Sequence, residues 1–251
     1  MDDLTRNEIY QLIKDTLVKK FEKYDPESKS TPFYDALFSR KAIFLSSLMH
    51  SLYTTFGMSL YEQIAGILAI GAGYQFKRGY KLLGTINDET RLLISHISSS
   101  DIRFCKSKDM EIKLIRESST LGKPDIYPDS TVDVFIIDND GVEYYVDITT
   151  VKPNKKETRA LRKKMLDWAA LRFSQDLDAK LKTIIGIPFN PYHPNPYNRS
   201  FVRDNCHYEE VLIQEDLWKL FAGEDVYKEM LQIFEEVGEK IKDDVNNFIG
   251  Y

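Results

Sequence analysis

One stretch constrains the fold more than any other part of the chain: residues 124–152, PDIYPDSTVDVFIIDNDGVEYYVDITTVK. It holds two apolar, β-branched runs, 131–137 and 143–151, which are separated by the polar residues 138–141. An Asp-Gly pair between two such runs is typical of a tight turn that joins antiparallel strands. The stretch therefore predicts a β-hairpin.

Each arm of this hairpin carries one carboxylate. Asp133 interrupts the first arm between Val132 and Val134, and Asp147 shares a face of the second arm with Tyr145. Aspartate is depleted in strands, and a buried, unpaired carboxylate is costly, so two of them close together need a cation or strong hydrogen-bond donors. A hard divalent ion such as Mg²⁺ fits these oxygen ligands. Alternatively, both aspartates lie near strand ends, where they are solvated or paired with Lys or Arg.

Composition narrows the class of protein. The 251 residues are 43% hydrophobic and 29% charged, as in ordinary globular proteins. No apolar run reaches about 18 residues and the start, MDDLTRNE, is unlike a secretory signal, so we expect a cytoplasmic protein without a membrane partner. The formal net charge of −5 disfavours a general coat of nucleic acid but permits a local basic groove. The spacing of the two cysteines and four histidines disfavours zinc.

Hydrophobic spacing predicts the order of the elements. Helices are expected over 1–24, in a core-packed pair within 32–56 that ends at Gly57, and over 63–74 and 85–98. The alternation of 111–117 predicts a strand, which forms a three-stranded meander with the hairpin. A helix over 155–180, a parallel buried strand over 183–188, and helices over 215–221 and 226–248 follow. Helix, meander, helix and strand in this order resemble the PD-(D/E)xK nuclease core.

Glu62 has two interpretations. Ser59 precedes the helix expected over 63–74, and Glu62 follows Ser59 by three residues, which is the spacing of a capping box. Alternatively, Glu62 faces the metal site from this helix as a third acidic group. The sequence leaves both open.

Two basic segments are candidates for phosphate contact. Residues 152–164 contain seven basic residues and the single acid Glu157, and one helix face carries Lys155, Arg159, Arg162 and Lys163. In the second segment, 75–84, the candidates are Lys77, Arg78 and Lys81. The alternatives are a solvated basic face in the first case and a solvated helix end in the second.

The segment 189–203, FNPYHPNPYNRSFVR, is too polar for a core and is punctuated by proline. Asn and Arg can each form two hydrogen bonds with the edge of adenine or guanine. We therefore assign base reading to this loop, with the candidates Asn190, His193, Asn195, Asn198, Arg199 and Arg203. A rigid surface loop is the alternative.

With these residues in view, the chain resembles the TdeIII-like group of type II restriction endonucleases, which are PD-(D/E)xK enzymes similar to those that cut GGNCC. The resemblance lies in TPFYDALF, GMSLYEQIA, VDITTVKPNKK, KKMLDWA, IPFNPYHPNPYNR and LWKLFAGEDVY, over most of the chain. It implies a single α/β restriction-endonuclease-like domain over 1–251, with a mixed sheet flanked by helices. Its expected parts are a mainly helical region (1–100), a catalytic core (108–190), and a recognition loop with C-terminal helices (191–251).

One departure from this resemblance concerns the catalytic lysine. The motif would read Asp/Glu-x-Lys, whereas this chain reads Asp147-Ile148-Thr149, and threonine supplies no cation. Lys152 is the nearest substitute, although its offset points it to the opposite face of a regular strand unless a bulge or the break at Pro153 turns it back. Lys163 or Lys164 from the following helix are further substitutes.

The resemblance implies Mg²⁺-dependent, sequence-specific hydrolysis of both strands of DNA. Asp133, Asp147 and the carbonyl of Ile148 would hold one or two ions, Lys152 would orient the attacking water, and Glu62 would be a further acid. A near-palindromic site implies a homodimer, and such an enzyme pairs with a cognate DNA methyltransferase. Three alternatives stay open: a repair or junction nuclease of the same fold, a catalytically silent DNA-binding protein because of Thr149, and a metal-free α/β protein.

Overall fold

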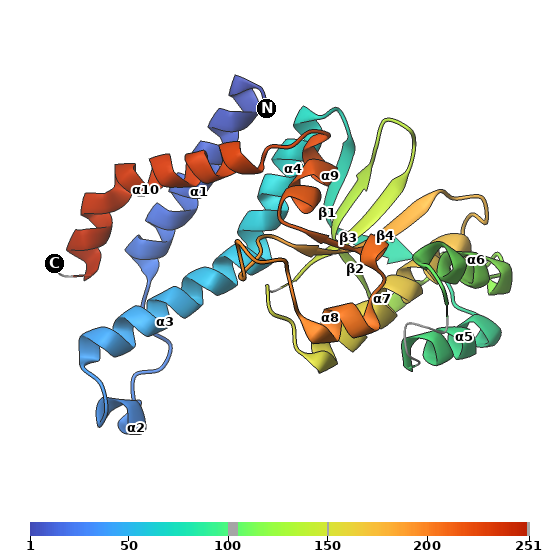
Figure 1. The fold of residues 1–251 in the computed structure, drawn as a ribbon, viewed down its shortest axis with the longest axis horizontal. Helices are drawn as coiled ribbons and strands as arrows, with labels where there is room; N and C mark the ends of the chain where they lie inside the picture. Colours follow the sequence, from blue (N-terminus) through green and yellow to red (C-terminus); the bar gives the residue numbers. More distant parts are fainter. Residues whose placement is uncertain (100–104, 150, 250–251) are drawn as a thin grey trace.

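The computed structural model describes residues 1–99, 105–149 and 151–249. A mixed sheet of five strands in the order β1-β2-β3-β4-β5 lies between two layers of helices (Figure 1). Strands β1 (Gln75–Leu83), β2 (Ile126–Ile137) and β3 (Glu143–Ile148) are antiparallel neighbours. Strands β4 (Leu181–Ile187) and β5 (Val211–Ile213) continue the sheet parallel to β3. The mixed α/β fold expected from the sequence is confirmed.

The two faces of the sheet pack against different helices. One face is covered by α5 (Asp88–Ser99), α6 (Lys108–Ser118), α7 (Lys155–Phe173) and α8 (Ser200–Asn205). The other is covered by α4 (Tyr61–Gly71) and α9 (Glu215–Ala222), and α1 (Asp3–Lys23) and α10 (Tyr227–Ile249) pack against these two helices. Alternate residues of β3 divide accordingly: Tyr145 packs into the first core and Val146 into the second. Odd-numbered positions of β3 therefore face α7.

The hairpin between β2 and β3 is confirmed, and its turn residues explain why it forms. The Asp138 carboxylate accepts hydrogen bonds from the amides of Asp140 and Val142, both at 2.9 Å. Gly141 has φ of +75°, a conformation that glycine adopts without steric cost. These contacts fix the pairing of Val134 with Val146.

The first strand of the meander is not the one that the sequence predicted. Residues 111–117 lie in helix α6, whose N-terminus is capped by the Ser107 hydroxyl, and Glu111 and Ile115 are buried one helical turn apart. The first strand is instead β1, which lies in the basic segment 75–84. The two interpretations of that segment were phosphate contact and a solvated helix end. An edge strand with one exposed side tolerates the charges of Lys77, Arg78 and Lys81. The region 1–100 is thus not wholly helical, and the sheet extends beyond 190 through β5.

Three expectations for residues 32–62 are wrong. The pair of helices, α2 (Pro32–Asp35) and α3 (Arg40–Thr55), does not lie in the core, because Leu48 is the one buried residue described in them. Gly57 does not end α3, since a π-helical turn, η1 (Phe56–Leu60), carries the chain directly into α4. The Ser59 hydroxyl accepts a hydrogen bond from the Gln63 side chain and caps no helix.

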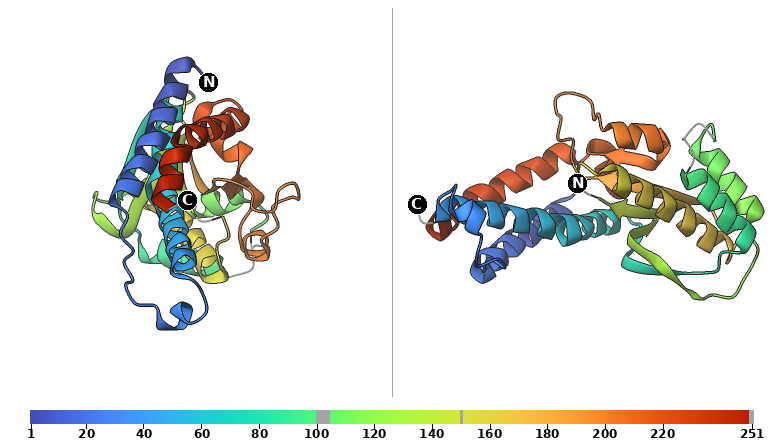
Figure 2. Two further views of the ribbon diagram at one scale, coloured as in Figure 1. Left: turned by 90° about the vertical axis from the view of Figure 1, so that its left-hand side faces the viewer. Right: turned by 90° about the horizontal axis from the view of Figure 1, so that it is seen from below.

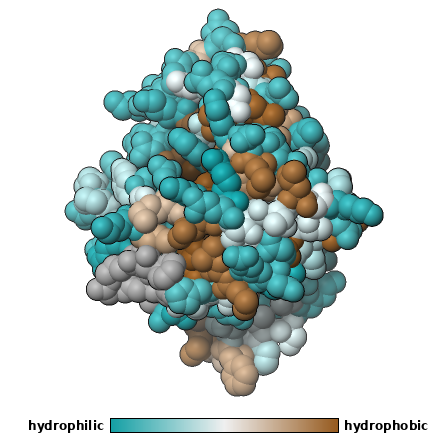
Figure 3. All heavy atoms as spheres, turned by 90° about the vertical axis from the view of Figure 1, so that its right-hand side faces the viewer, coloured by the Kyte–Doolittle hydropathy of each residue, from teal (hydrophilic) through white to brown (hydrophobic). Residues whose placement is uncertain are grey.

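The molecule is elongated. Helices α1, α2, α3 and α10 extend from one end of the sheet and form an arm, whereas α5 and α6 lie at the opposite end (Figures 1 and 2). Figure 3 shows that opposite end, where hydrophobic side chains are interspersed among hydrophilic ones. Among the described helices, none combines the length and the apolar character needed to cross a membrane. The helices expected over 1–24, 85–98, 215–221 and 226–248 are confirmed, and the one that begins at Lys155 ends earlier than expected, at Phe173.

Candidate active site

The two aspartates of the hairpin face each other where β2 and β3 begin to separate. Because Val134 pairs with Val146, the next positions along the two strands are Asp133 and Asp147. The Asp133 carboxylate also accepts a hydrogen bond from the Ile148 amide at 3.2 Å. Asp147 is only 7% exposed. Asp147 is therefore not solvated, and it pairs with Lys164 near the end of β3, as the alternative interpretation allowed.

This pair carries more negative charge than its surroundings balance. Burial, and after it the facing Asp147 carboxylate and Glu62, raise the pKa of Asp133 to about 7. The ammonium of Lys164 and the Ile148 amide act in the opposite direction without cancelling this rise. A carboxyl group with a raised pKa beside a groove is typical of functional sites.

Lys164 is the lysine in contact with the pair. Its Nζ lies 2.5 Å from Oδ2 of Asp147 and also 4.9 Å from the centre of the Trp168 ring. On α7, Lys164 follows Leu161 by three residues and precedes Trp168 by four, so it interrupts the packing stripe of the helix. A lysine on the packing side of a helix is the sequence signal that distinguishes it from its neighbours.

A groove of about 600 Å³ opens beside this pair. Strands β2 and β3 form one wall and α7 forms the other, with the lining residues Asp129, Thr131, Asp147, Thr149, Glu157, Ala160, Leu161, Lys163, Lys164 and Asp167. Thr149, at the motif position normally held by lysine, lines the groove beside Lys164. Asp129, Glu157 and Asp167 were not predicted from the sequence as groove residues.

The donor set fits a hard divalent cation that keeps part of its hydration shell. In residues 1–99, 105–149 and 151–249, no three His, Cys, Asp or Glu side chains are placed together to hold a metal. Two facing carboxylates with unbalanced charge are nevertheless what Mg²⁺ uses, because this ion retains several waters and binds substrate phosphate through the remaining positions. The residues at the site thus suit Mg²⁺ better than an ion that must be held entirely by protein side chains.

Lys152 lies elsewhere. Its side chain is exposed, and its Nζ sits 5.5 Å from the centre of the Tyr192 ring in the loop after β4. Strand β3 ends at Ile148, so Lys152 lies beyond it, and the alternation of the strand does not set the direction of the Lys152 side chain. The role expected for Lys152 is better matched by Lys164, one of the two alternatives on the following helix.

Glu62 approaches the pair from α4, on the other face of the sheet. Its carboxylate pairs with the Arg78 guanidinium at 2.5 Å and is near enough to Asp133 to raise the pKa of that group. This contact also holds Arg78 against the protein. Lys77, its neighbour on β1, is exposed and stacks over the Tyr80 ring at 5.1 Å.

The basic residues expected on one face of α7 differ in exposure. Lys155, Arg159 and Lys163 are exposed, and Lys163 forms an ion pair with Asp167. Arg162 is 1% exposed and is surrounded by Glu111 and Glu210. Arg162 therefore cannot contact phosphate at the surface, and we leave it out of the candidate DNA contacts.

The proline-rich loop lies beside the chain segment that follows β3. The Arg199 guanidinium donates to the Pro153 carbonyl at 3.1 Å, and the Tyr197 hydroxyl donates to the Val151 carbonyl at 3.2 Å. Asn190 organises the loop, since its side chain donates to the Asn195 carbonyl at 2.8 Å. The other four candidate side chains of the loop lie at the surface. His193, Asn195, Asn198 and Arg203 are exposed, and Asn198 accepts a hydrogen bond from Arg203.

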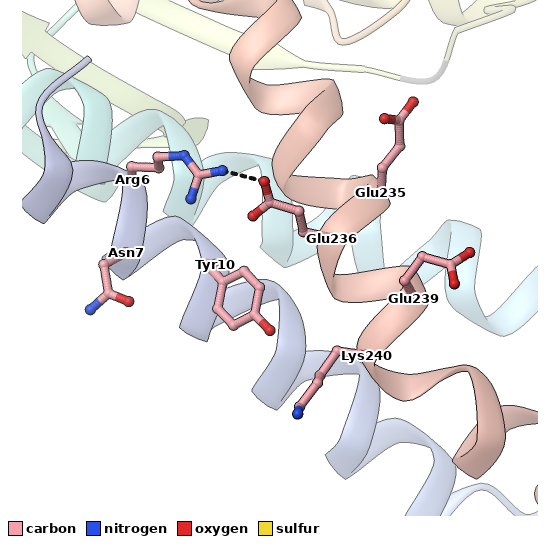
Figure 4. A pocket seen from close by; sticks show the side chains of 7 residues that line it. All are labelled: Arg6, Asn7, Tyr10, Glu235, Glu236, Glu239 and Lys240. Atoms are coloured by element: carbon pink, nitrogen blue, oxygen red, sulfur yellow. Dashed lines mark hydrogen bonds and ion pairs between the residues drawn. The ribbon is translucent and has the colours of Figure 1, made fainter.

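A second hollow, of about 760 Å³, lies between α1 and α10 (Figure 4). Its α10 side carries three glutamates, and Arg6 of α1 pairs with one of them, Glu236, at 2.6 Å. Lys240 and the uncharged Asn7 and Tyr10 complete the pictured wall. This hollow shares no residue with the aspartate groove, and its acidic side disfavours binding of phosphate.

Known type II restriction enzymes are similar to this chain over most of its length. The family model of the type II restriction endonuclease HinfI matches residues 1–238. The type II restriction enzyme MjaII of Methanocaldococcus jannaschii is 30% identical over 210 residues, covering 78% of this chain and 56% of MjaII. The type II restriction enzyme HgiCII of Herpetosiphon aurantiacus is 23% identical over 214 residues, covering 82% and 77% of the two chains. The chain thus spans little more than half the length of MjaII.

The match over residues 1–238 includes the hairpin, the groove beside it, helix α7 and the proline-rich loop. It confirms the type II restriction endonuclease part of the resemblance that the sequence motifs indicated. The chain therefore belongs to the HinfI family of type II restriction endonucleases.

Proposed function

We propose that this protein is a Mg²⁺-dependent endonuclease that hydrolyses both strands of DNA at a short specific site. The observation that carries the proposal is the buried, facing pair Asp133 and Asp147, whose negative charge a single lysine leaves unbalanced. The relatives named above are type II restriction enzymes, which supports the same reaction.

In this proposal Asp133, Asp147 and the carbonyl of Ile148 bind the metal. Bound Mg²⁺ would lower the pKa of a water molecule and offset charge that develops on the scissile phosphate. Glu62 remains a further acid on the far side of Asp133, held by Arg78. The raised pKa of Asp133 means that a cation at this site would be favoured by relief of repulsion between the two carboxylates.

Lys164 takes the role that the motif lysine has elsewhere in the superfamily. Its Nζ is already hydrogen-bonded to Asp147, so it lies at the same carboxylate as the proposed metal. From there it can orient the attacking water and stabilise negative charge on the phosphate. Thr149 supplies no charge, and Lys152 stacks on Tyr192 instead.

The DNA would lie along the exposed basic side of α7 and reach the proline-rich loop. Phosphate contacts are assigned to Lys155, Arg159 and Lys163, with Lys77 and Arg78 on the edge strand. Base contacts are assigned to Asn190, His193, Asn195, Asn198, Arg199 and Arg203. Arg199 joins this loop to the segment after β3, which keeps base reading in register with the metal site.

The finer features of the proposal come from the TdeIII-like resemblance. They are a GGNCC-type recognition site, one restriction-endonuclease-like unit over 1–251, and action beside a cognate DNA methyltransferase. One chain offers one aspartate pair on the hairpin, so cutting two strands of a near-palindromic site calls for a homodimer related by a two-fold axis.

The proposal is tested by incubating purified protein with unmethylated phage DNA in Mg²⁺ or in EDTA. Discrete fragments are expected in Mg²⁺ only, and sequencing their ends gives the site and the stagger. Asp147→Ala should abolish the fragments while a gel shift in EDTA is retained. Intact DNA with wild-type protein in Mg²⁺, despite a gel shift, would overturn the assignment as an active nuclease.

A further inference from the structure

The longest uncharged stretch of the chain lies on an exposed helix. Residues 42–61, AIFLSSLMHSLYTTFGMSLY, contain no Asp, Glu, Lys or Arg in a chain of which 29% of the residues are charged. Most of this stretch is α3, and Leu48 is the one buried residue described in that helix. Surface helices normally carry charged residues on their solvent face, so this surface is unusual for one that faces water.

The neighbouring helix α2 contacts α3 and carries further exposed hydrophobic side chains. Six large hydrophobic side chains of this part of the arm are 44–84% exposed: Phe33, Tyr34, Leu37, Phe38, Met49 and Tyr53. Side chains of this size and exposure amount to apolar surface on the order of 700 Å². A standard protein interface buries about 800 Å² on each partner, so the patch is of the right size for one.

The exposed side of α3 has the spacing of a helix that packs against another helix. Ala42, Ser46, Met49 and Tyr53 are all exposed and follow one another at intervals of four, three and four residues. This is the repeat of a helix–helix seam. The opposite side of α3 is already occupied, because Phe44 packs against the rings of Tyr24 and Phe248 at 5.5 and 5.7 Å.

We propose that the exposed surface of α2 and α3 is the interface with a second copy of this chain. The inference rests on the proposed function, in which two copies cut the two strands. A two-fold axis places the patch of one copy against the same patch of the other copy, so like charges in the patch would repel each other. This patch meets the requirement, since 42–61 is uncharged and the flanking Asp35 pairs with Arg40 at 3.2 Å.

The chemistry of the patch disfavours a different occupant. A surface for DNA would carry Lys or Arg to meet phosphate along its length, whereas the two basic residues of α3, Arg40 and Lys41, lie in its first turn and the helix carries none over 42–55. The patch lies on the arm, at the end of the molecule opposite α5 and α6 (Figure 1). Pairing there brings two chains together through their arms.

The test is sedimentation equilibrium of the whole chain in EDTA without DNA. Leu37→Lys and Met49→Lys each place a charge in the patch at a side chain that is already exposed, so folding, checked by circular dichroism, should be unaffected. The matched control is Leu92→Lys, which changes a 72%-exposed leucine on α5 at the other end of the molecule. The wild type and the control should be dimers, and the two patch variants should dissociate at least about 10-fold more readily.

Two results would overturn the inference: a wild type that is monomeric at micromolar concentration, or patch variants that dimerise as tightly as the wild type. Plasmid cleavage is measured in parallel. Patch variants that nick one strand more readily than they cut both would support the interface. A stable, patch-dependent dimer that fails to cut DNA in Mg²⁺ would support the interface and contradict the proposed function instead.

Discussion

Helix α7 supplies one cation to each of two sets of buried carboxylates, and the two sets differ in how their charge is balanced. Arg162 lies between Glu111 and Glu210, and Lys108 pairs with both of these glutamates. We call these four residues the buried ion cluster. Among the residues that the structure describes, Lys164 is the one cation in an ion pair with the facing pair, at Asp147. Two cations thus balance two acids in the first set, whereas one cation is left with two acids in the second.

The pKa values follow this difference. Burial by itself would raise the pKa of Glu210, but the nearby Lys108 and Arg162 outweigh it and hold that pKa below its usual value. Burial, and after it the Asp147 carboxylate, raise the pKa of Asp133 to about 7. A balanced cluster stabilises the fold, whereas an unbalanced pair keeps a place for a cation from solution. In the proposed function, this contrast distinguishes the acids that stabilise the fold from those that bind the metal.

Removing a cation from the buried ion cluster should produce the largest loss of stability. Arg162→Met leaves two fully buried glutamates with one lysine, and we expect the free energy of unfolding to fall by about 3–5 kcal/mol. Urea denaturation followed by circular dichroism measures this change. The matched control is Arg159→Met, an exposed arginine on the same helix, which should change stability by less than about 0.5 kcal/mol. Equal effects of the two variants would contradict the structural role of the cluster.

Removing the lysine of the unbalanced pair should affect chemistry and not folding. We expect Lys164→Met to lower the single-turnover rate of plasmid cleavage by about 100-fold, because charge on the phosphate loses its nearest ammonium. Affinity for DNA in EDTA should change little. Lys113→Met is the control, since this exposed lysine lies on α6, outside the groove, and pairs with Glu117. If Lys152→Met, and not Lys164→Met, lost the activity, the assignment of Lys164 would fail.

Neutralising one acid of the unbalanced pair should stabilise the metal-free protein. The pKa of Asp133 is about 7 when folded, above its usual value, so the folded state binds more protons between these values and stability falls as pH rises toward 7. At pH 8 in EDTA, Asp133→Asn should raise the free energy of unfolding by roughly 1–3 kcal/mol while abolishing cleavage. This gain in stability is followed as a higher melting temperature. If the melting temperature of Asp133→Asn equalled or fell below that of the wild type, the charge at this pair would not be unbalanced.

The buried ion cluster should show the opposite pH dependence. Since the pKa of Glu210 is lowered on folding, its contribution is present above the unfolded pKa and is lost as pH falls through the lower folded value. The gap in stability between the wild type and Glu210→Gln should therefore narrow below about pH 4. Glu111, Lys108, Arg162 and His207 all face this carboxylate or its partners. Urea titrations at several acidic pH values measure the gap, and a gap that stays constant would contradict the sign.

Local pattern and turn chemistry were enough to predict the hairpin and both aspartates. The alternation of apolar residues sets the strand faces, and Asp138 and Gly141 set the turn, so the position of Asp133 opposite Asp147 follows from neighbouring residues. The helices that flank the sheet were predicted for the same reason, because a period of 3.6 residues recurs over several turns.

Contacts between distant segments were not predictable in this way. The partners of Arg162 lie 51 and 48 residues away, so a basic helix face gave no sign that this arginine is buried. Seven residues, 111–117, fit both an alternating and a helical pattern, and the helix is selected by the burial of Glu111 beside Arg162. Which lysine reaches Asp147 depends on how α7 crosses back between the parallel strands β3 and β4.

The most direct measurement of the central claim is a titration of Mn²⁺, a paramagnetic substitute for Mg²⁺, followed by electron paramagnetic resonance. Wild-type protein and Glu210→Gln, a variant of the balanced cluster whose folding is checked by circular dichroism, should bind one or two ions per chain with similar affinity. Asp147→Asn should bind at least about 10-fold more weakly, because half of the carboxylate pair is lost. Unchanged binding in Asp147→Asn would contradict the assignment of this pair as the metal site.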